Sequence, residues 1–187
     1  LVDLFFYQAE KENSQTSFLE WLNSKNRIKF TWGETSTSIY KLAKVLKKNI
    51  KDGDRCLLVS ENRPEWLIAD LSIMLANGIT VPAYTTYTEK DYKYLIEDCE
   101  PSVIIISNDE MHDKLKNIIK EKSFIKKIIT FDKVQKADYD NQYLNFNSII
   151  KNTLSENDKI KNLNLKRSSA ACIIYTSGTG GNPKGVI

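Results

Sequence analysis

Short apolar runs alternate with longer amphipathic runs through the middle of the chain. Residues 56–60 read CLLVS, 102–107 read SVIIIS and 126–131 read KKIITF, each bounded by turn residues. Runs of this kind are typical of strands buried on both faces of a parallel sheet. ITVPAY (79–84) adds a further strand, which we expect Pro82 to end. Strands that alternate with helices predict an α/β fold with a largely parallel sheet and right-handed crossovers.

Helical patterns lie between these strands. Over residues 35–50, apolar positions recur at three- and four-residue steps and lysines occupy the other face, which predicts an amphipathic helix with solvated lysines. Pro64 suits the first turn of a second helix, which we expect to run to Asn77 and to stop at Gly78. That helix is apolar on most sides, so we expect it to be buried.

Two more helices follow further along the chain. Thr88 and Asp91 form a capping-box pattern that opens a helix ending near Asp98. Residues 111–122 have the composition of another helix, placed between two of the apolar strands. This continued alternation of strand and helix extends the predicted parallel sheet.

Two regions have weaker patterns. FLEWL (18–22) is helix-like and precedes a short strand at 28–32. Residues 132–166 are rich in Asn, Asp and Lys, and the one helical candidate inside them is YLNFNSIIKNTL (143–154). The chain closes on AACIIYTSGTGGNPKGVI, which we interpret as a buried strand followed by a loop rich in Gly, Ser and Thr.

Composition restricts the class of protein. The chain has 187 residues, 41% hydrophobic and 27% charged, which suits one soluble domain or a large subdomain. Its 27 basic and 24 acidic residues leave a net charge of +3, too little for the basic field that nucleic-acid binding needs. Cys56, Cys99 and Cys172 have neither zinc-site nor disulfide spacing, so we interpret them as reduced cytosolic thiols.

Localisation follows from the absence of targeting patterns. LVDLFFYQAE (1–10) lacks the basic lead-in and the small-residue site of a signal peptide. No stretch approaches the roughly 18 apolar residues that cross a bilayer. We therefore expect a cytoplasmic protein with at most peripheral membrane contact.

Several conspicuous side chains have an ordinary structural interpretation. We expect Arg63 and Glu65 to be exposed or locally paired at a helix start, and His112 to be a surface histidine. A lysine-rich stretch could touch an acidic membrane, but we favour a solvated helix face; it comprises Lys114, Lys116, Lys120, Lys122, Lys126 and Lys127. Three aromatic residues near the strands could line a site, but we favour a core position for them: Trp66, Tyr84 and Tyr87.

The loop near the end of the chain has the chemistry of a phosphate site. Residues 176–185 combine glycines, hydroxyl and amide side chains and one lysine directly after a predicted strand. Glycines let backbone N–H groups converge on an anion, hydroxyls add donors, and the lysine adds a full positive charge. A Walker loop is excluded because Val186 follows Gly185 where a lysine is required, and Pro183 stands where a dinucleotide fingerprint has its third glycine.

This loop resembles a known family signature. YTSGTGGNPKGV is similar to the YTSGTTGxPKGV motif of the adenylate-forming superfamily, which includes acyl-CoA synthetases, luciferases and peptide-synthetase adenylation domains. Gly180 departs from the usual Thr and removes one hydroxyl. The segment DGDRCLLVSENRPEWLIADLSIMLANGITVPAYTT (52–86) resembles long-chain acyl-CoA synthetases, and the similarity covers about 31–106 and 169–187.

The resemblance implies a fold, a reaction and a site. Residues 1–187 would be an incomplete N-terminal AMP-binding domain with its phosphate-binding loop at 175–186, and the rest of the large domain and a C-terminal mobile domain would lie outside this chain. The implied reaction is fatty acid activation through acyl-AMP to acyl-CoA, with ATP, Mg²⁺ and coenzyme A. The family's metal, ribose and catalytic-lysine residues would also lie outside, so we expect 1–187 alone to be inactive. The implied ligands of the β- and γ-phosphates are Thr176, Ser177, Gly178, Thr179, Gly180, Gly181 and Lys184.

Two alternatives share the loop. An amino-acid or aryl-acid adenylating enzyme would differ in its acyl pocket, which the resemblance implies to be mostly outside this chain. A noncatalytic nucleotide-binding fragment would keep the loop without the reaction. In all three cases the partners are small molecules, and the sequence makes no prediction of oligomeric state.

Overall fold

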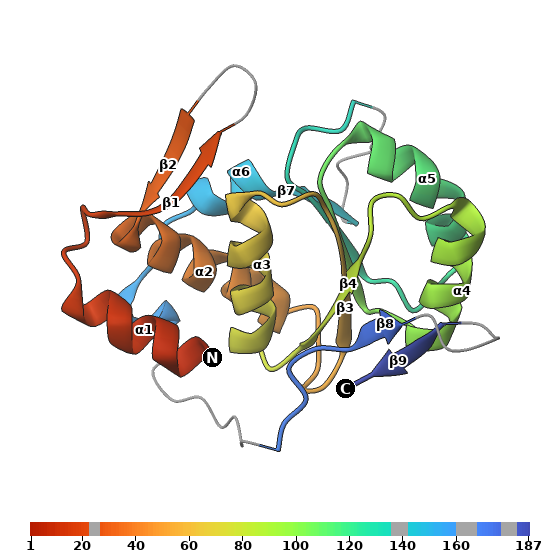
Figure 1. Ribbon diagram of the computed structural model, residues 1–187, viewed down its shortest axis with the longest axis horizontal. Helices are drawn as coiled ribbons and strands as arrows, with labels where there is room; N and C mark the ends of the chain where they lie inside the picture. The colour runs from red at the N-terminus through yellow and green to blue at the C-terminus, as the bar shows by residue number, and fades with distance from the viewer. Residues whose placement is uncertain (23–26, 136–141, 160–167, 177–182) are drawn as a thin grey trace.

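A computed structural model describes residues 1–22, 27–135, 142–159, 168–176 and 183–187. Its centre is a five-stranded sheet in the order β4-β3-β5-β6-β7, in which every neighbouring pair is parallel (Figure 1). The predicted α/β fold with a largely parallel sheet is therefore confirmed. The strands are β3 (Arg55–Val59), β4 (Ile79–Ala83), β5 (Val103–Ile106), β6 (Lys127–Thr130) and β7 (Tyr143–Asn145).

Helices cover both faces of this sheet (Figure 1). They are α1 (Val2–Lys11), α2 (Trp32–Lys47), α3 (Pro64–Leu75) and α6 (Phe146–Lys151) on one face, and α4 (Glu89–Cys99) and α5 (Asp109–Lys120) on the other; a short 3₁₀ turn, η1, spans Glu156–Asp158. Successive side chains of a strand point to opposite faces, so Cys56 and Leu58 of β3 join the first core, while Leu57 and Val59 join the second. The unbroken apolar strands are explained by this burial on both sides.

Capping residues set the helix boundaries. α2 begins three residues before the predicted start because Thr31 and Glu34 form a capping box: the Glu34 N–H donates to Thr31 Oγ1 (3.1 Å) and the Thr31 N–H donates to the Glu34 carboxylate (2.9 Å). The predicted capping box of Thr88 and Asp91 opens α4 as expected. Each box satisfies N–H groups that the first helical turn leaves without a partner.

α3 starts at Pro64 as predicted but ends by a different device. Asn77, not Gly78, takes the left-handed conformation (φ 63°), and the N–H groups of Asn77 and Gly78 donate to the carbonyls of Met74 and Ile73. Gly78 is needed for space, because a Cβ there would lie 2.8 Å from a methyl carbon of Ile50. α3 therefore ends near the predicted place, but the left-handed residue is Asn77 and not Gly78.

Three predictions about secondary structure are wrong, and strand pairing explains each of them. FLEWL lies in strand β1 (Ser17–Leu22), which pairs antiparallel with β2 (Arg27–Thr31). YLN forms β7 at the sheet edge before α6 begins. Pro82 does not end β4 but lies inside it, opposite Leu58. Thr80, two residues earlier, bonds outward to the 171–173 segment, so the N–H that Pro82 lacks falls on that outer side and not toward β3.

The N-terminal segment, which the sequence analysis distinguished from a signal peptide, forms α1. Its Val2 and Phe5 are buried in the first core. Within the described residues, no helix combines the length and the apolar character needed to cross a membrane.

Candidate functional site

The predicted phosphate loop is carried by a small hairpin and not by a strand of the central sheet. Cys172 makes an isolated parallel bridge to Thr80, after which β8 (Ile174–Thr176) pairs antiparallel with β9 (Lys184–Val186). The expected buried strand is therefore wrong: Ile174 is 49% exposed, and only Tyr175 of β8 is buried. β8 and β9 form a two-stranded sheet of their own with three residues in each strand, and so small a sheet can bury only one of its two faces.

Two of the predicted phosphate ligands face each other at the end of this hairpin where the predicted loop begins and ends. Thr176 and Lys184 are partners in the strand register, and both are exposed. Residues opposite each other in an antiparallel pair project from the same face, so the hydroxyl and the ammonium group share one surface. Among the described residues, no ion pair of Lys184 is found. The remaining predicted ligands, Ser177, Gly178, Thr179, Gly180 and Gly181, lie outside the described residues.

The other face of the hairpin carries the buried Tyr175 and explains one glycine of the motif. Tyr175 is opposite Gly185, and a Cβ on Gly185 would lie 2.8 Å from Ile173 Cγ2 and 3.3 Å from Tyr175 Cζ. A side chain at this position would meet both neighbours. Gly185 therefore lets the Tyr175 ring pack across β9.

A hollow opens beside the hairpin at the carboxyl ends of β3 and β4. Its volume is about 450 Å³, within the range of small-molecule pockets. Ligands of open parallel sheets bind at this end of the strands. The polar residues at the hollow are Ser60–Asn62, which follow β3, and Thr85, which follows β4. Its aromatic side chains are Trp66, Tyr84, Tyr87 and Tyr175.

Sequence reasoning favoured a core position over a site lining for Trp66, Tyr84 and Tyr87, and made no prediction for the Tyr175 side chain. Tyr84 is 69% exposed, so its interpretation as core is wrong, whereas Trp66 and Tyr87 pack against the two cores and also face the hollow. The signal that could have located three of them is that Trp66 lies in the connection after β3, while Tyr84 and Tyr87 lie in the connection after β4, because side chains there collect at one edge of the sheet.

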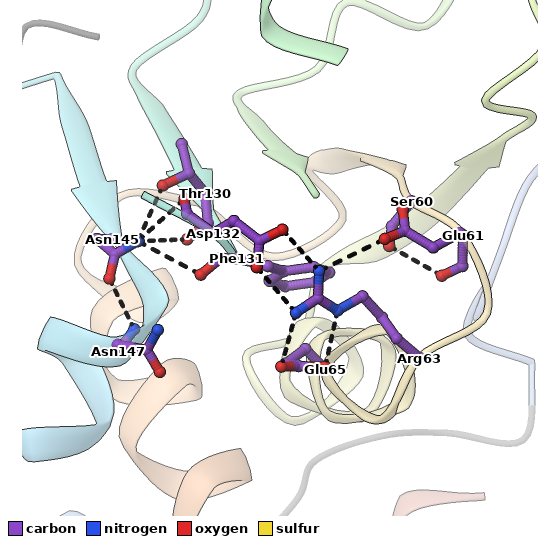
Figure 2. Close-up of polar contacts among 9 residues, drawn as sticks. All are labelled: Ser60, Glu61, Arg63, Glu65, Thr130, Phe131, Asp132, Asn145 and Asn147. Atoms are coloured by element: carbon purple, nitrogen blue, oxygen red, sulfur yellow. Dashed lines mark hydrogen bonds and ion pairs between the residues drawn. The ribbon is translucent and has the colours of Figure 1, made fainter. Parts of the chain in front are cut away.

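Arg63 holds together the turns after β3 and β6 (Figure 2). Its guanidinium donates to both carboxylate oxygens of Glu65 (2.9 and 3.0 Å) and to both of Asp132 (3.0 and 3.2 Å), and it lies 3.5 Å from Glu61. The Arg63 side chain is only 7% exposed. A residue adjoining the segment that lines the hollow is thus anchored to a strand end 69 residues away.

Aromatic rings complete the Arg63 site. The guanidinium carbon lies 5.1 Å from the centre of the Trp21 ring and 5.5 Å from that of Phe131, within cation–π range. Burial lowers the pKa of Arg63, but hydrogen bonds to Glu65 and Asp132 outweigh it, and the net pKa lies above the ordinary value. Local pairing of Arg63 was predicted correctly, whereas an exposed position for it is wrong. Its contacts are structural, since they are satisfied within the protein.

Other titratable groups offer no catalytic cluster within the described residues. His112 is 4% exposed and its Nε2 lies 3.4 Å from Tyr143 Oη, so the predicted surface position is wrong. The three cysteines are free, as predicted, and burial raises the pKa of Cys99 to about 12 and that of Cys56 still further. No three His, Cys, Asp or Glu side chains in the described ranges could together hold a metal ion.

Many lysines of the predicted solvated face are paired with carboxylates. Lys114, Lys116 and Lys122 lie 3.0, 2.6 and 2.7 Å from Glu110, Asp113 and Glu97. Pairs of this kind at a surface neutralise each other and leave less charge for a membrane.

Comparisons with known proteins agree with the fold and show the family. The family model described as "AMP-binding enzyme" matches residues 5–187. Rat long-chain-fatty-acid–CoA ligase ACSBG1 is 24% identical over all of this chain, which corresponds to 26% of that protein; ACSBG2 of Xenopus laevis is 32% identical over 67% of this chain and 17% of its own length. The chain thus spans about a quarter or less of these curated relatives.

Solved structures share the architecture at lower identity. The anthranilate CoA ligase AuaEII, solved with anthranoyl-AMP, superposes with a TM-score of 0.83 at 20% identity over 99% of this chain and 33% of its own. Acetoacetyl-CoA synthetase from Streptomyces lividans gives 0.85 at 15% identity over 99% of this chain and 29% of its own. The family match along nearly the whole chain shows that this protein belongs to the AMP-binding, adenylate-forming enzymes.

Proposed function

We propose that this chain carries the ATP phosphate site of an acid–CoA ligase that activates a fatty acid. The observation that carries the proposal is the pairing of Thr176 and Lys184 on the exposed face of the β8–β9 hairpin. This arrangement puts a hydroxyl donor beside a cation where the predicted loop begins and ends. The loop would hold the β- and γ-phosphates through Thr176, Ser177, Gly178, Thr179, Gly180, Gly181 and Lys184.

The proposed reaction has two steps. A carboxylate oxygen of the acid attacks the α-phosphorus of ATP, the bond to the bridging oxygen breaks, and acyl-AMP and pyrophosphate result. The sulfur of coenzyme A then attacks the acyl carbon, loses its proton, and AMP leaves. In the first step negative charge accumulates on the departing pyrophosphate, and preorganised donors with a lysine charge stabilise it.

The described residues contribute phosphate binding but no metal site. Mg²⁺ prefers carboxylate and water oxygens, and the described part of this chain gathers no such group of ligands. We therefore assign Mg²⁺ and coenzyme A to no residue here. Lys184 and Thr176 fit the nucleotide's phosphates because phosphate oxygens accept hydrogen bonds from ammonium and hydroxyl groups.

Removal of the lysine charge tests the phosphate site. In the full-length enzyme, Lys184→Ala deletes a charge-assisted contact of about 1.5–3 kcal/mol, so kcat/KM for ATP should fall roughly ten- to hundredfold. Lys47→Ala removes an equally exposed lysine at the end of α2 and serves as the control. Wild-type ATP kinetics in Lys184→Ala would contradict the assignment.

A fatty acid is proposed as the substrate because the curated relatives are named long-chain-fatty-acid–CoA ligases. Each buried methylene would add about 0.8 kcal/mol, so activity should rise with acyl length until the pocket is full. Pyrophosphate exchange by the full-length protein with acetate, octanoate, palmitate, benzoate and amino acids measures this preference. Highest activity with an aryl or amino acid would reject the fatty acid proposal and leave the phosphate site standing.

A further inference from the structure

The hairpin that carries Thr176 and Lys184 is anchored at its base to the central sheet. The Thr80 N–H donates to the Ala171 carbonyl (3.1 Å), and the Ile173 N–H donates to the Thr80 carbonyl (2.9 Å). From there the two short strands run beside α4 (Figure 1). Beyond Ile173, β8 remains beside β4, and side-chain contacts with α4 are added.

Two tyrosine hydroxyls make such contacts, one to each strand. Tyr94 of α4 donates to the Pro183 carbonyl (2.9 Å), and Tyr175 of β8 donates to the Asp98 carboxylate. Tyr94 and Asp98 are four residues apart and so lie on one face of α4. The contacted residues, Tyr175 and Pro183, immediately precede Thr176 and Lys184. Thr176 and Lys184 are thus each one residue from an anchor.

Hydrogen bonds matter here because apolar packing between α4 and the hairpin is incomplete. A cavity of about 180 Å³ separates them, lined by both tyrosines, Pro183, Leu95, Tyr87 and the start of α4. Burial, with the Asp98 hydrogen bond as a second cause, raises the pKa of the Tyr175 hydroxyl. The hydroxyl therefore keeps its proton at neutral pH and remains a donor.

α4 is itself firmly placed. Its first turn is closed by the Thr88–Asp91 capping box, its Tyr92 is fully buried and donates to the Tyr84 carbonyl (2.7 Å), and Glu97 pairs with Lys122 (2.7 Å). Because α4 is held at both ends and along its buried face, its hydrogen bonds can fix the position of the hairpin.

We propose that Tyr94 and Asp98 of α4, with Tyr175, are positioning residues for nucleotide binding, which hold the two strands so that Thr176 and Lys184 stay side by side. They touch no phosphate in this scheme and act through the hairpin. The proposal rests on the proposed phosphate site and deepens it. Preorganised donors lose less on binding than donors that must first be ordered.

Hydroxyl deletion in the full-length protein tests the positioning role. Tyr94→Phe and Tyr175→Phe each keep the ring and remove one hydrogen bond. Asp98→Ala removes the carboxylate that accepts the Tyr175 hydrogen bond. Tyr40→Phe, which deletes the hydroxyl of a partly buried tyrosine on α2, is the matched control. Amide hydrogen exchange of residues 172–187 and the KM values for ATP and for the acid are measured in each variant.

The expected result is faster exchange in residues 172–187 and an ATP KM raised about two- to tenfold by each hydroxyl deletion, with the acid KM unchanged. Unchanged exchange, or faster exchange with an unchanged ATP KM, would overturn the positioning role even if the parent enzyme is active. An equal loss for both substrates would indicate general destabilisation and also overturn it. A parent protein that binds no ATP would instead reject the proposed function itself, which is a separate outcome.

Discussion

Substitution of Arg63 by methionine should strongly destabilise the fold. Methionine keeps an apolar stem between Trp21 and Phe131 but removes the guanidinium, which leaves the Glu65 carboxylate without its two hydrogen bonds. The Glu65 side chain is 15% exposed, so water replaces little of what is lost. Removal of one partner from a buried ion pair costs about 3–5 kcal/mol.

The more exposed partners reduce this figure. Asp132 and Glu61 are 51% and 41% exposed, and solvent screens their share of the interaction. The lower end of the range, about 3 kcal/mol, is therefore the expected loss in free energy of unfolding. Urea denaturation of the chain followed by tryptophan fluorescence measures it, because Trp21 lies against the guanidinium.

A comparison within the chain makes the test specific. Arg27 pairs with Glu20 at the surface, where the two side chains are 58% and 36% exposed, so Arg27→Met should leave the urea midpoint unchanged within error. Glu65→Gln should cost more than Asp132→Asn because Glu65 is the more buried partner. If Arg63→Met were no more harmful than Arg27→Met, the Arg63 network would be no more than another surface ion pair.

Two further predictions concern other buried contacts. Gly185→Ala places a Cβ against Ile173 and Tyr175 and should cost the hairpin about 1–3 kcal/mol, seen as faster amide exchange in residues 172–187 of the full-length protein; an unchanged exchange rate would show that the neighbours yield freely. Burial raises the pKa of Asp70, which is 8% exposed, so the folded state binds its proton more tightly than the unfolded chain. The resulting stability is fully present below the ordinary carboxyl pKa of about 3.9 and is lost as pH rises through the raised value. Because other carboxyls, such as Asp54 and Asp158, have lowered pKa values and stabilise the fold as pH rises, the measure is the urea midpoint of the parent minus that of Asp70→Asn. This difference should fall from acid to neutral pH; parallel curves would refute the assignment.

The sequence by itself determined the elements whose formation depends on near neighbours. The capping box of Thr88 and Asp91, the proline at the first turn of α3 and the apolar runs of β3, β5 and β6 are local features, and each has the predicted structure. The family followed from one contiguous motif for the same reason, since a loop that binds phosphate needs its donors close together in sequence. Thr176 and Lys184 are the members of that motif that the described residues include.

Tertiary structure decided everything that depends on a distant partner. FLEWL became a strand because Arg27–Thr31 pairs with it, and YLN joined the sheet because β6 offered a free edge. Pairing energy from another strand is absent from a local pattern and outweighs the small preference of a short segment for helix.

Burial was decided in the same way. His112, which sequence reasoning placed at the surface, and Arg63, expected to be exposed or locally paired, are both enclosed by elements far along the chain. Likewise, the contacts of Tyr94 with Pro183 and of Tyr175 with Asp98 span 89 and 77 residues. No periodicity signals such contacts, because they arise only when strand and helix packing brings separate segments together.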